Sequence, residues 1–401
     1  MCIFKKVSIV LTSAILILHI QTAQAGPGWP AVYDPQTLLN LNLDMSAADW
    51  NTVKNDTSFD IEVPAMFWAD GEMPILISVR RKSAAALGDK VSLKLDINEY
   101  VDQQWNDLKK LSLENGDDED VIAEGFAWYL NRLAAQASGS SYSPGLASWV
   151  TLYVNGEYQG VYVNVEQPDK QFLKNRGLYT GNQTWLYKAG DISKVELKVG
   201  DGDSPATGTL CYSPFVAEAK SNGKDSRGQC TAPDTDESMA AEFNRLIDMQ
   251  AMLTQAAVEA FVMNPDALFS HGKNFYYIDY SDARRMYLPW DYDASFVSNK
   301  PDASIYGTQK GNRLSQTAYQ ELIINNAEFR SKYKNIMAGL LKGPLQIDAQ
   351  IALLNNLEVL LTSALEADVN NNLDDSVSER FEALRQWLNR RVLSVSGQLD
   401  S

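Results

Sequence analysis

Three polar residues in the second half of the chain have the types and the spacing of a magnesium site. Asp266 follows an Asn-Pro pair that ends a helical pattern, Asn274 stands eight residues later, and Asp291 ends a short apolar strand. The residues from Asn274 to Leu288 resemble two strands joined by a turn, so a hairpin would bring these side chains together. Mg²⁺ is often held by one or two such oxygen ligands plus substrate phosphates.

The same residues also fit a simpler interpretation. A β-hairpin commonly carries Asp and Asn in its turns, where their side chains bond to nearby backbone groups. For each aspartate taken alone, a solvated turn residue is the more frequent case. The order of the other charged residues along the chain favours the site over the turn.

The charge of the chain narrows its range of partners. Its 401 residues carry a formal net charge of -16, with 45% hydrophobic and 21% charged residues. This is the composition of a globular protein large enough for two lobes. Nucleic acid and anionic membranes are disfavoured, because binding them requires a surface rich in Lys and Arg. A nucleotide would have to bind through a local basic site or through metal ions.

One early strand offers such a basic site. Apolar residues alternate with Lys90, Ser92 and Lys94, which therefore share one face of the strand. Two lysines and a serine on one face suit phosphate, although a solvated strand face is the simpler interpretation for either lysine alone. A helical pattern over residues 118–134 follows and carries Glu124.

Two further segments indicate export and a disulfide. Residues 1–25 combine two lysines, a short apolar run and a small-x-small cleavage pattern, as a signal peptide does. We expect a periplasmic or extracellular mature chain without a membrane span. Cys211 and Cys230 are the cysteines that remain after cleavage, and we expect them to form a disulfide that holds an insertion at residues 190–236.

The hydrophobic period changes from two to 3.6 along the chain. Alternating segments dominate residues 26–189, including a hairpin whose Asn155-Gly156 pair is typical of a type I′ turn. Helical spacing dominates residues 237–401. We therefore expect an α+β protein in which a β-rich N-terminal lobe precedes a mostly helical C-terminal lobe.

The sequence resembles the CotH kinase family, which is named for spore coat protein H. The resemblance extends over most of the chain, roughly from Leu39 to Phe296. It implies a fold like that of atypical protein kinases, with ATP-dependent phosphorylation of protein Ser or Thr and Mg²⁺ as a cofactor. The residues that carry it are the run Val79–Ser83, the strand Lys90–Asp96, the hairpin Leu152–Leu173, Leu186–Lys188, Asn274–Tyr276 and Pro289–Asp293.

The resemblance also implies roles for the candidate catalytic residues. Lys90 or Lys94 would contact the phosphates of ATP, and Glu124 would orient that lysine. Asp266 would accept the proton of the substrate hydroxyl or position it. The order of these residues along the chain agrees with that of a kinase.

The remaining assignments concern the metal and the nucleotide. Asn274 and Asp291 would hold Mg²⁺, with Asp293 as a further ligand. The adenine would lie beside Glu166 and Gln167. The residues assigned to nucleotide binding are Arg80, Glu166, Gln167 and Lys188.

Two other hypotheses come from different classes of protein. A non-catalytic, kinase-like scaffold for surface or envelope assembly would explain why Lys82 is followed by Ser-Ala-Ala-Ala, where family members commonly carry a turn with glycine and hydroxyl groups. A calcium-dependent adhesion module would use the acidic loop 368–379. That loop has Leu373 where a calcium loop requires glycine for its sharp turn.

Overall fold

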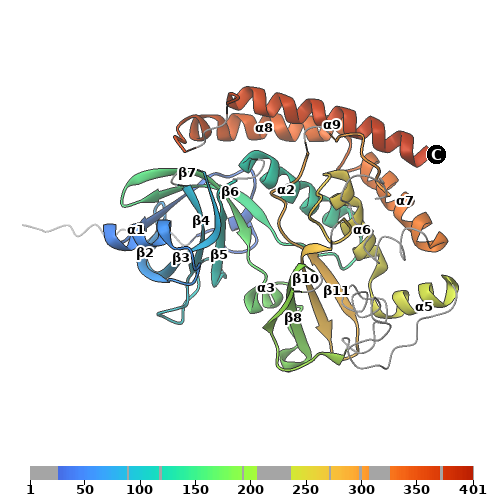
Figure 1. The fold of residues 1–401 in the computed structure, drawn as a ribbon, viewed down its shortest axis with the longest axis horizontal. Helices are drawn as coiled ribbons and strands as arrows, with labels where there is room; N and C mark the ends of the chain where they lie inside the picture. The colour runs from blue at the N-terminus through green and yellow to red at the C-terminus, as the bar shows by residue number, and fades with distance from the viewer. Residues whose placement is uncertain are drawn as a thin grey trace, which may run out of the picture.

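A computed structural model shows how the chain is arranged (Figure 1). The candidate signal peptide, Cys211 and Cys230 lie outside the described residues, and so does the segment 315–325, whose helical spacing also predicts a helix. None of the helices that the structure describes has the length and apolarity needed to cross a membrane. The described residues are 26–87, 90–116, 120–191, 194–205, 236–270, 272–297, 300–306, 326–370 and 374–400.

Seven strands in the N-terminal half form a closed barrel in the order β1-β2-β3-β4-β5-β7-β6. Alternating residues point inward and are buried, among them Leu41, Phe67 and Leu93. Asn155 and Gly156 have φ of 53° and 81°, as a type I′ turn requires, which confirms the hairpin expected there. The strands are β1 (Leu39–Asp44), β2 (Val63–Ala69), β3 (Ile75–Leu87), β4 (Lys90–Asp96), β5 (Lys110–Glu114), β6 (Ala147–Val154) and β7 (Glu157–Glu166).

The expected kinase-like β lobe is wrong, although the α+β content is as expected. Strand β1 pairs with β6 in parallel, which places Leu39 opposite Val150, and it pairs with β2 in antiparallel fashion. These two pairings close the sheet into a barrel. Alternation within each strand determines which side chains face inward but not which strands meet, so the sequence pattern did not reveal the closure.

A second sheet has the strand order β11-β10-β8-β9. Its central hairpin, β10 with β11, confirms the two strands expected between Asn274 and Leu288. Strand β8 pairs with β10, so Lys188 lies opposite Tyr276. The strands are β8 (Thr184–Asp191), β9 (Lys194–Val199), β10 (Lys273–Tyr280) and β11 (Arg285–Pro289).

Helices connect the barrel to the second sheet. Helix α2 (Val121–Ser138) packs against β6 and β7 on one side and against α6 (Met249–Phe261) on the other. Helices α8 and α9 run side by side along the edge of the molecule opposite the second sheet and extend over the barrel (Figure 1). The other helical elements are η1 (Ala31–Tyr33), α1 (Ala47–Asn55), α3 (Lys170–Asn175), η2 (Gly181–Gln183), α5 (Asp236–Leu246), α7 (Ala327–Lys342), α8 (Ile347–Glu366) and α9 (Val377–Asp400).

The α8–α9 pair is joined to both halves of the fold by buried charges. Asp368, which follows α8, forms a 2.8 Å ion pair with Lys90 of β4, and the two side chains are 0% and 1% exposed. The same carboxylate accepts a 3.1 Å hydrogen bond from the Val161 backbone N–H of β7. Arg380 of α9 binds both carboxylate oxygens of Asp120, the N-cap residue of α2. The C-terminal helices therefore fix the barrel and α2 relative to each other.

Candidate active site

The loop after α6 is tied to the chain that follows β11. Asn264 bridges the two segments, because its Nδ2 donates to the Asp291 carbonyl oxygen (2.9 Å) and its Oδ1 accepts from the Asp266 N–H (3.0 Å). The Asp266 carboxylate pairs with Lys273 at 3.2 Å, and both side chains are partly exposed. The structure thus brings Asp266 and Asp291 to the same place.

Two of the predicted metal ligands occupy unusual backbone positions beside each other. Asn274 has a φ of 50° and Asp291 a φ of 64°, both in the left-handed region. The Trp290 N–H donates to the Asn274 carbonyl oxygen (3.1 Å), which holds the two residues together at the end of the β10–β11 hairpin. Left-handed conformations of residues other than glycine concentrate at functional sites.

Helix α2 brings a buried carboxylate to this region. Glu124, in the first turn, is 1% exposed, and its Oε2 has no hydrogen-bond partner among the described residues. Burial raises the pKa of Glu124 well above its ordinary value, and the negative charges of Glu114, Asp291 and Asp293 raise it further. The pKa shift therefore reflects burial first and the repulsion from neighbouring carboxylates second.

Lys82 of β3 is the cation that meets this group. Its ammonium pairs with Glu114 of β5 and lies 4.9 Å from the centre of the Trp290 ring. Burial by itself would lower the pKa of Lys82, but Glu114 and Asp291 outweigh it, and the pKa is raised. Neither Lys82 nor Glu114 was expected here from the sequence. The usable signal for Lys82 was its place in the run 79–83 that carries the family resemblance.

Lys188 of β8 lies next to Lys82. Its ammonium is 5.4 Å from the centre of the Trp290 ring and 5.9 Å from that of Tyr276. Burial lowers the pKa of Lys188 to about 8, and the positive charge of Lys82 contributes to this shift. The described part of the chain offers its ammonium neither an ion pair nor a hydrogen bond.

Lys94 is a second lysine of this kind. It lies on the outer face of β4, where it pairs with Arg80 of β3. Arg80 precedes Lys82 by two residues in the same strand. Burial lowers the pKa of Lys94 to about 8, and the nearby charges of Lys110 and Arg80 lower it further. Arg80 itself donates to the Phe59 carbonyl oxygen (2.6 Å). No described acceptor or carboxylate binds the Lys94 ammonium.

Lys90 is directed elsewhere. Its ammonium donates to Asp368 (2.8 Å) and to the Val161 carbonyl oxygen (2.6 Å) beneath the α8–α9 pair. Burial lowers the pKa of Lys90, and Asp368 opposes that shift. The structure does not bring Lys90 to the carboxylates, and its charge is already matched by a buried partner.

The two residues assigned to the adenine differ in their availability. Both oxygens of the Glu166 carboxylate are engaged, with Arg176 at 2.8 and 2.6 Å, Trp29 Nε1 at 2.8 Å and the Leu146 N–H at 3.1 Å. Gln167 instead donates from Nε2 to the Tyr276 hydroxyl (2.9 Å) beside Lys188. Of the two side chains, Gln167 is the one directed toward the lysines.

Mg²⁺ fits the donor set at the end of β11. No three or more carboxylate, histidine or cysteine side chains within the described ranges already surround a common metal position. Mg²⁺ requires only one or two protein carboxylates when phosphates and water supply the other ligands. Asp291 and Asp293 are candidates for that role. A divalent cation would also offset the repulsion around the buried, unpartnered Oε2 of Glu124.

Carboxylates near unpaired lysines are the kind of groups that could bind a phosphate-bearing ligand together with a metal ion. Comparison with known families agrees with this chemistry, because the model of the CotH kinase protein family matches residues 77–394. The chain therefore belongs to the CotH kinase family. The matched region includes Lys82, Glu124 and Asp291. Comparison with curated proteins found no match.

Proposed function

We propose that this protein is an exported kinase that transfers the γ-phosphate of ATP to Ser or Thr of a protein substrate, with Mg²⁺ as the cofactor. Membership of the CotH kinase family supports the reaction class, and the signal-like segment at 1–25 supports export. The observation that carries the proposal is Lys188. Its half-buried ammonium lies beside Lys82 and Trp290 without an ion pair in the described part of the chain.

An anionic ligand explains why such lysines are present. Burying an ammonium without a counter-ion is unfavourable, and the pKa values of about 8 at Lys94 and Lys188 record that cost. The whole chain has a net charge of -16, so the lysines stand out from the average surface. A bound polyphosphate would place several negative charges between them and restore their charged state.

The residues of the site divide the work of phosphoryl transfer. Lys82, Lys94 and Lys188 would bind the phosphates of ATP, and Asp291 with Asp293 would hold Mg²⁺. When bound, Mg²⁺ would supply positive charge to the phosphate oxygens. Such a reaction depends mainly on positioning and charge neutralisation, so few protein groups are required.

Asp266 faces the acceptor in this scheme. The acceptor oxygen forms a bond to the γ-phosphorus as the bond from phosphorus to the β–γ bridging oxygen breaks. ADP leaves, and Asp266 takes the proton of the acceptor hydroxyl. Lys273, which is 3.2 Å from the Asp266 carboxylate, orients that carboxylate before transfer.

Calorimetry of ATP binding to the purified protein, with Mg²⁺ and then with EDTA, tests the proposal. We expect metal-dependent binding that Lys188→Gln weakens at least tenfold and that Asp291→Asn makes insensitive to EDTA. Lys342→Gln, which removes an exposed lysine at the end of α7, is the matched control and should bind ATP as the wild type does. Absence of binding at millimolar ATP would overturn the kinase assignment.

A non-catalytic scaffold is the second candidate, and one observation favours it. Strand β3 continues through Ser83 and Ala84, and Arg81 donates to the carbonyl oxygens of both residues (2.7 and 2.6 Å). The segment after Lys82 is thus an extended strand held by Arg81. Under this hypothesis, the Asp266→Ala/Asp291→Ala double variant keeps the biological role of the protein in cells. Loss of that role would argue for the kinase.

A further inference from the structure

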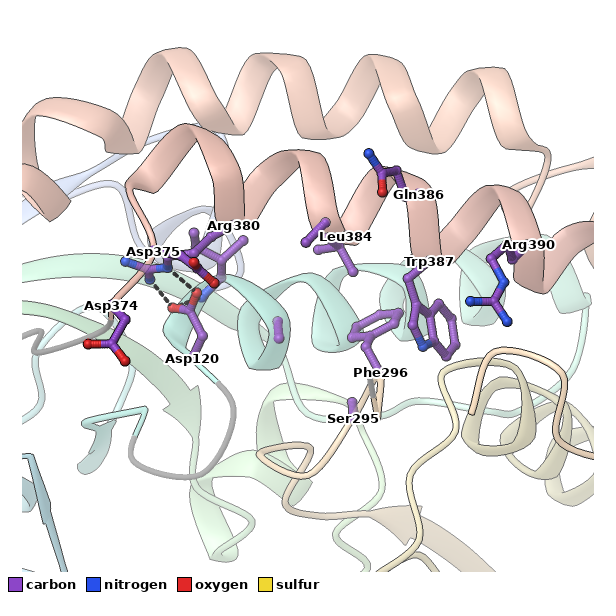
Figure 2. A pocket seen from close by; sticks show the side chains of 13 residues that line it. Asp120, Ser295, Phe296, Asp374, Asp375, Arg380, Leu384, Gln386, Trp387 and Arg390 are labelled. Atoms are coloured by element: carbon purple, nitrogen blue, oxygen red, sulfur yellow. Dashed lines mark hydrogen bonds and ion pairs between the residues drawn. The ribbon is translucent and has the colours of Figure 1, made fainter. Parts of the chain in front are cut away.

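A cavity of about 570 Å³ opens between the start of α2 and α9. Its walls come from the start of α2, the segment 295–296 and the face of α9 that includes Leu384 and Trp387 (Figure 2). Ligand pockets for small molecules usually have volumes of about 300–1,000 Å³. None of the lysines and carboxylates of the candidate active site lines this cavity.

The middle of the cavity is aromatic and fixed in shape. The rings of Phe296 and Trp387 meet edge to face, with centroids 5.1 Å apart and an interplanar angle of 88°. The Trp387 Nε1–H donates to the Val297 carbonyl oxygen (2.9 Å), so the indole is held in place and its polar group is satisfied. Leu384 and Ile122 complete an apolar surface that suits a flat ring.

One buried polar group in the wall has no partner. Ser295 is fully buried, and its Oγ makes no hydrogen bond within the described part of the chain. Buried hydroxyls are nearly always hydrogen-bonded in proteins, because leaving one unpaired is costly. A ligand that brings a polar group to this wall would satisfy Ser295.

The charges around the opening are unbalanced. Arg380 is neutralised by Asp120, and Arg390 pairs with Asp302 at 2.8 Å. Asp374 and Asp375 are exposed on the rim, and neither makes an ion pair with any described residue. Figure 2 shows both aspartates at the Asp120–Arg380 end of the cavity, with Trp387 toward the other end. The rim therefore offers two carboxylates to a cation.

From these features we propose that the cavity binds a small aromatic ammonium compound with a hydroxyl group on its ring. The ring lies against Phe296 and Trp387, the hydroxyl bonds to Ser295 Oγ, and the ammonium pairs with Asp374 and Asp375. The proposal uses none of the residues assigned to ATP, so its test does not depend on the proposed kinase activity.

The location of the cavity gives such a ligand a route to the active site. Ala123 in its wall precedes Glu124, and Ser295 follows Asp293 by two residues. A ligand in the cavity therefore contacts the two segments that carry these carboxylates. Any effect of the ligand on ATP affinity is matched by an equal effect of ATP on ligand affinity.

Fluorine NMR with 3-fluorotyramine as the probe tests the site on the purified full chain. We expect saturable binding to the wild type that weakens at least tenfold in Asp374→Asn/Asp375→Asn, where two exposed charges are removed. Ala383→Trp fills the cavity from an exposed position on α9 and should abolish binding. Leu393→Trp changes another position of α9 that is 75% exposed and lies away from the cavity, so it should leave binding unchanged.

Two ligand comparisons sharpen the result. The anionic isostere 3-(3-fluoro-4-hydroxyphenyl)propanoate should bind at least tenfold more weakly than 3-fluorotyramine, because the two aspartates repel its carboxylate. 3-Fluorophenethylamine, which lacks the hydroxyl, should bind to the wild type several-fold more weakly than 3-fluorotyramine does. The two compounds should bind to Ser295→Ala with equal affinity. No saturable binding, undiminished binding to Ala383→Trp, or equal binding of the anion would each overturn the proposal.

Discussion

Asp368→Asn leaves Lys90 without its counter-ion at a place that water does not reach. The side chains of this pair are 0% and 1% exposed, and they join the α8–α9 pair to the barrel. Asparagine has nearly the shape of aspartate, and its Oδ1 can still accept the hydrogen bond that Val161 N–H donates at 3.1 Å. The substitution therefore changes charge while it preserves packing.

Two independent arguments limit the loss of folding stability expected for Asp368→Asn. Removing one partner of a buried ion pair costs about 3–5 kcal/mol. The loss cannot greatly exceed the cost of taking the proton from Lys90. For a lysine with an ordinary pKa of about 10.4, that cost is about 4.6 kcal/mol at pH 7. Burial lowers the pKa of Lys90 even with Asp368 in place, so removing this carboxylate lowers the pKa further and favours the neutral lysine.

Urea unfolding followed by circular dichroism measures this loss. The Lys90→Met/Asp368→Asn double variant is the control, because it removes both charges and should lie within about 1.5 kcal/mol of the wild type. The single variant should also gain stability as the pH rises from 7 to 10, by up to about 1.4 kcal/mol per unit wherever its folded state has released the Lys90 proton and its unfolded state still binds it. Wild-type stability in the single variant, or a double variant as unstable as the single one, would refute the reasoning.

Three further predictions concern other buried charges. ATP affinity should fall about tenfold between pH 7 and 9 because Lys188, with a pKa of about 8, loses its charge, and calorimetry of Lys188→Gln should show a flatter profile. Asp120→Ala removes both the N-cap of α2 and the partner of Arg380, and it should cost about 3–5 kcal/mol in urea unfolding, whereas Arg380→Lys should cost less. Glu259 has a pKa of about 8, above the usual 4.5, so in the folded protein it retains a proton that it releases in the unfolded chain. Stability should therefore fall as pH rises from 5 to 8, and melting curves of Glu259→Gln should show a smaller fall.

Local sequence patterns were sufficient for the hairpin that carries Asn274 and Asp291, the two predicted metal ligands. Asn274 and Asp291 are 17 positions apart, and the strands between them pair through a short turn, so their meeting depends on neighbours in the sequence. The same is true of the Asn155-Gly156 hairpin. Where the geometry depended on residues close in the chain, the expectation and the structure agree.

The surroundings of the two lysines that the sequence predicted to contact phosphate depended on distant residues. Lys90 and Lys94 share the outer face of β4, as expected, but different parts of the fold cover the two residues. Lys90 meets Asp368, 278 residues later, whereas Lys94 lies near Arg80. Alternation along a strand assigns a side chain to a face but does not identify the element that covers that face.

The barrel and the Glu166 contacts illustrate the same limit. The parallel pairing of Leu39 with Val150 closes the sheet over a separation of more than a hundred residues. The Glu166 carboxylate is occupied by Arg176, ten residues later, and by Trp29, 137 residues earlier. No periodic pattern in the sequence contains such information, because each contact is set by the packing of the complete fold.

The α8–α9 pair also has a consequence for the order in which the protein can mature during synthesis. Lys90 leaves the ribosome 278 residues before Asp368, and Asp120 leaves 260 residues before Arg380. An unfinished chain can therefore form strands but cannot neutralise these two buried charges. The barrel wall and the start of α2 reach their final stability only when the last helix arrives. A chain that ends prematurely lacks the two ion pairs that stabilise its N-terminal half. We therefore expect proteases to degrade it readily.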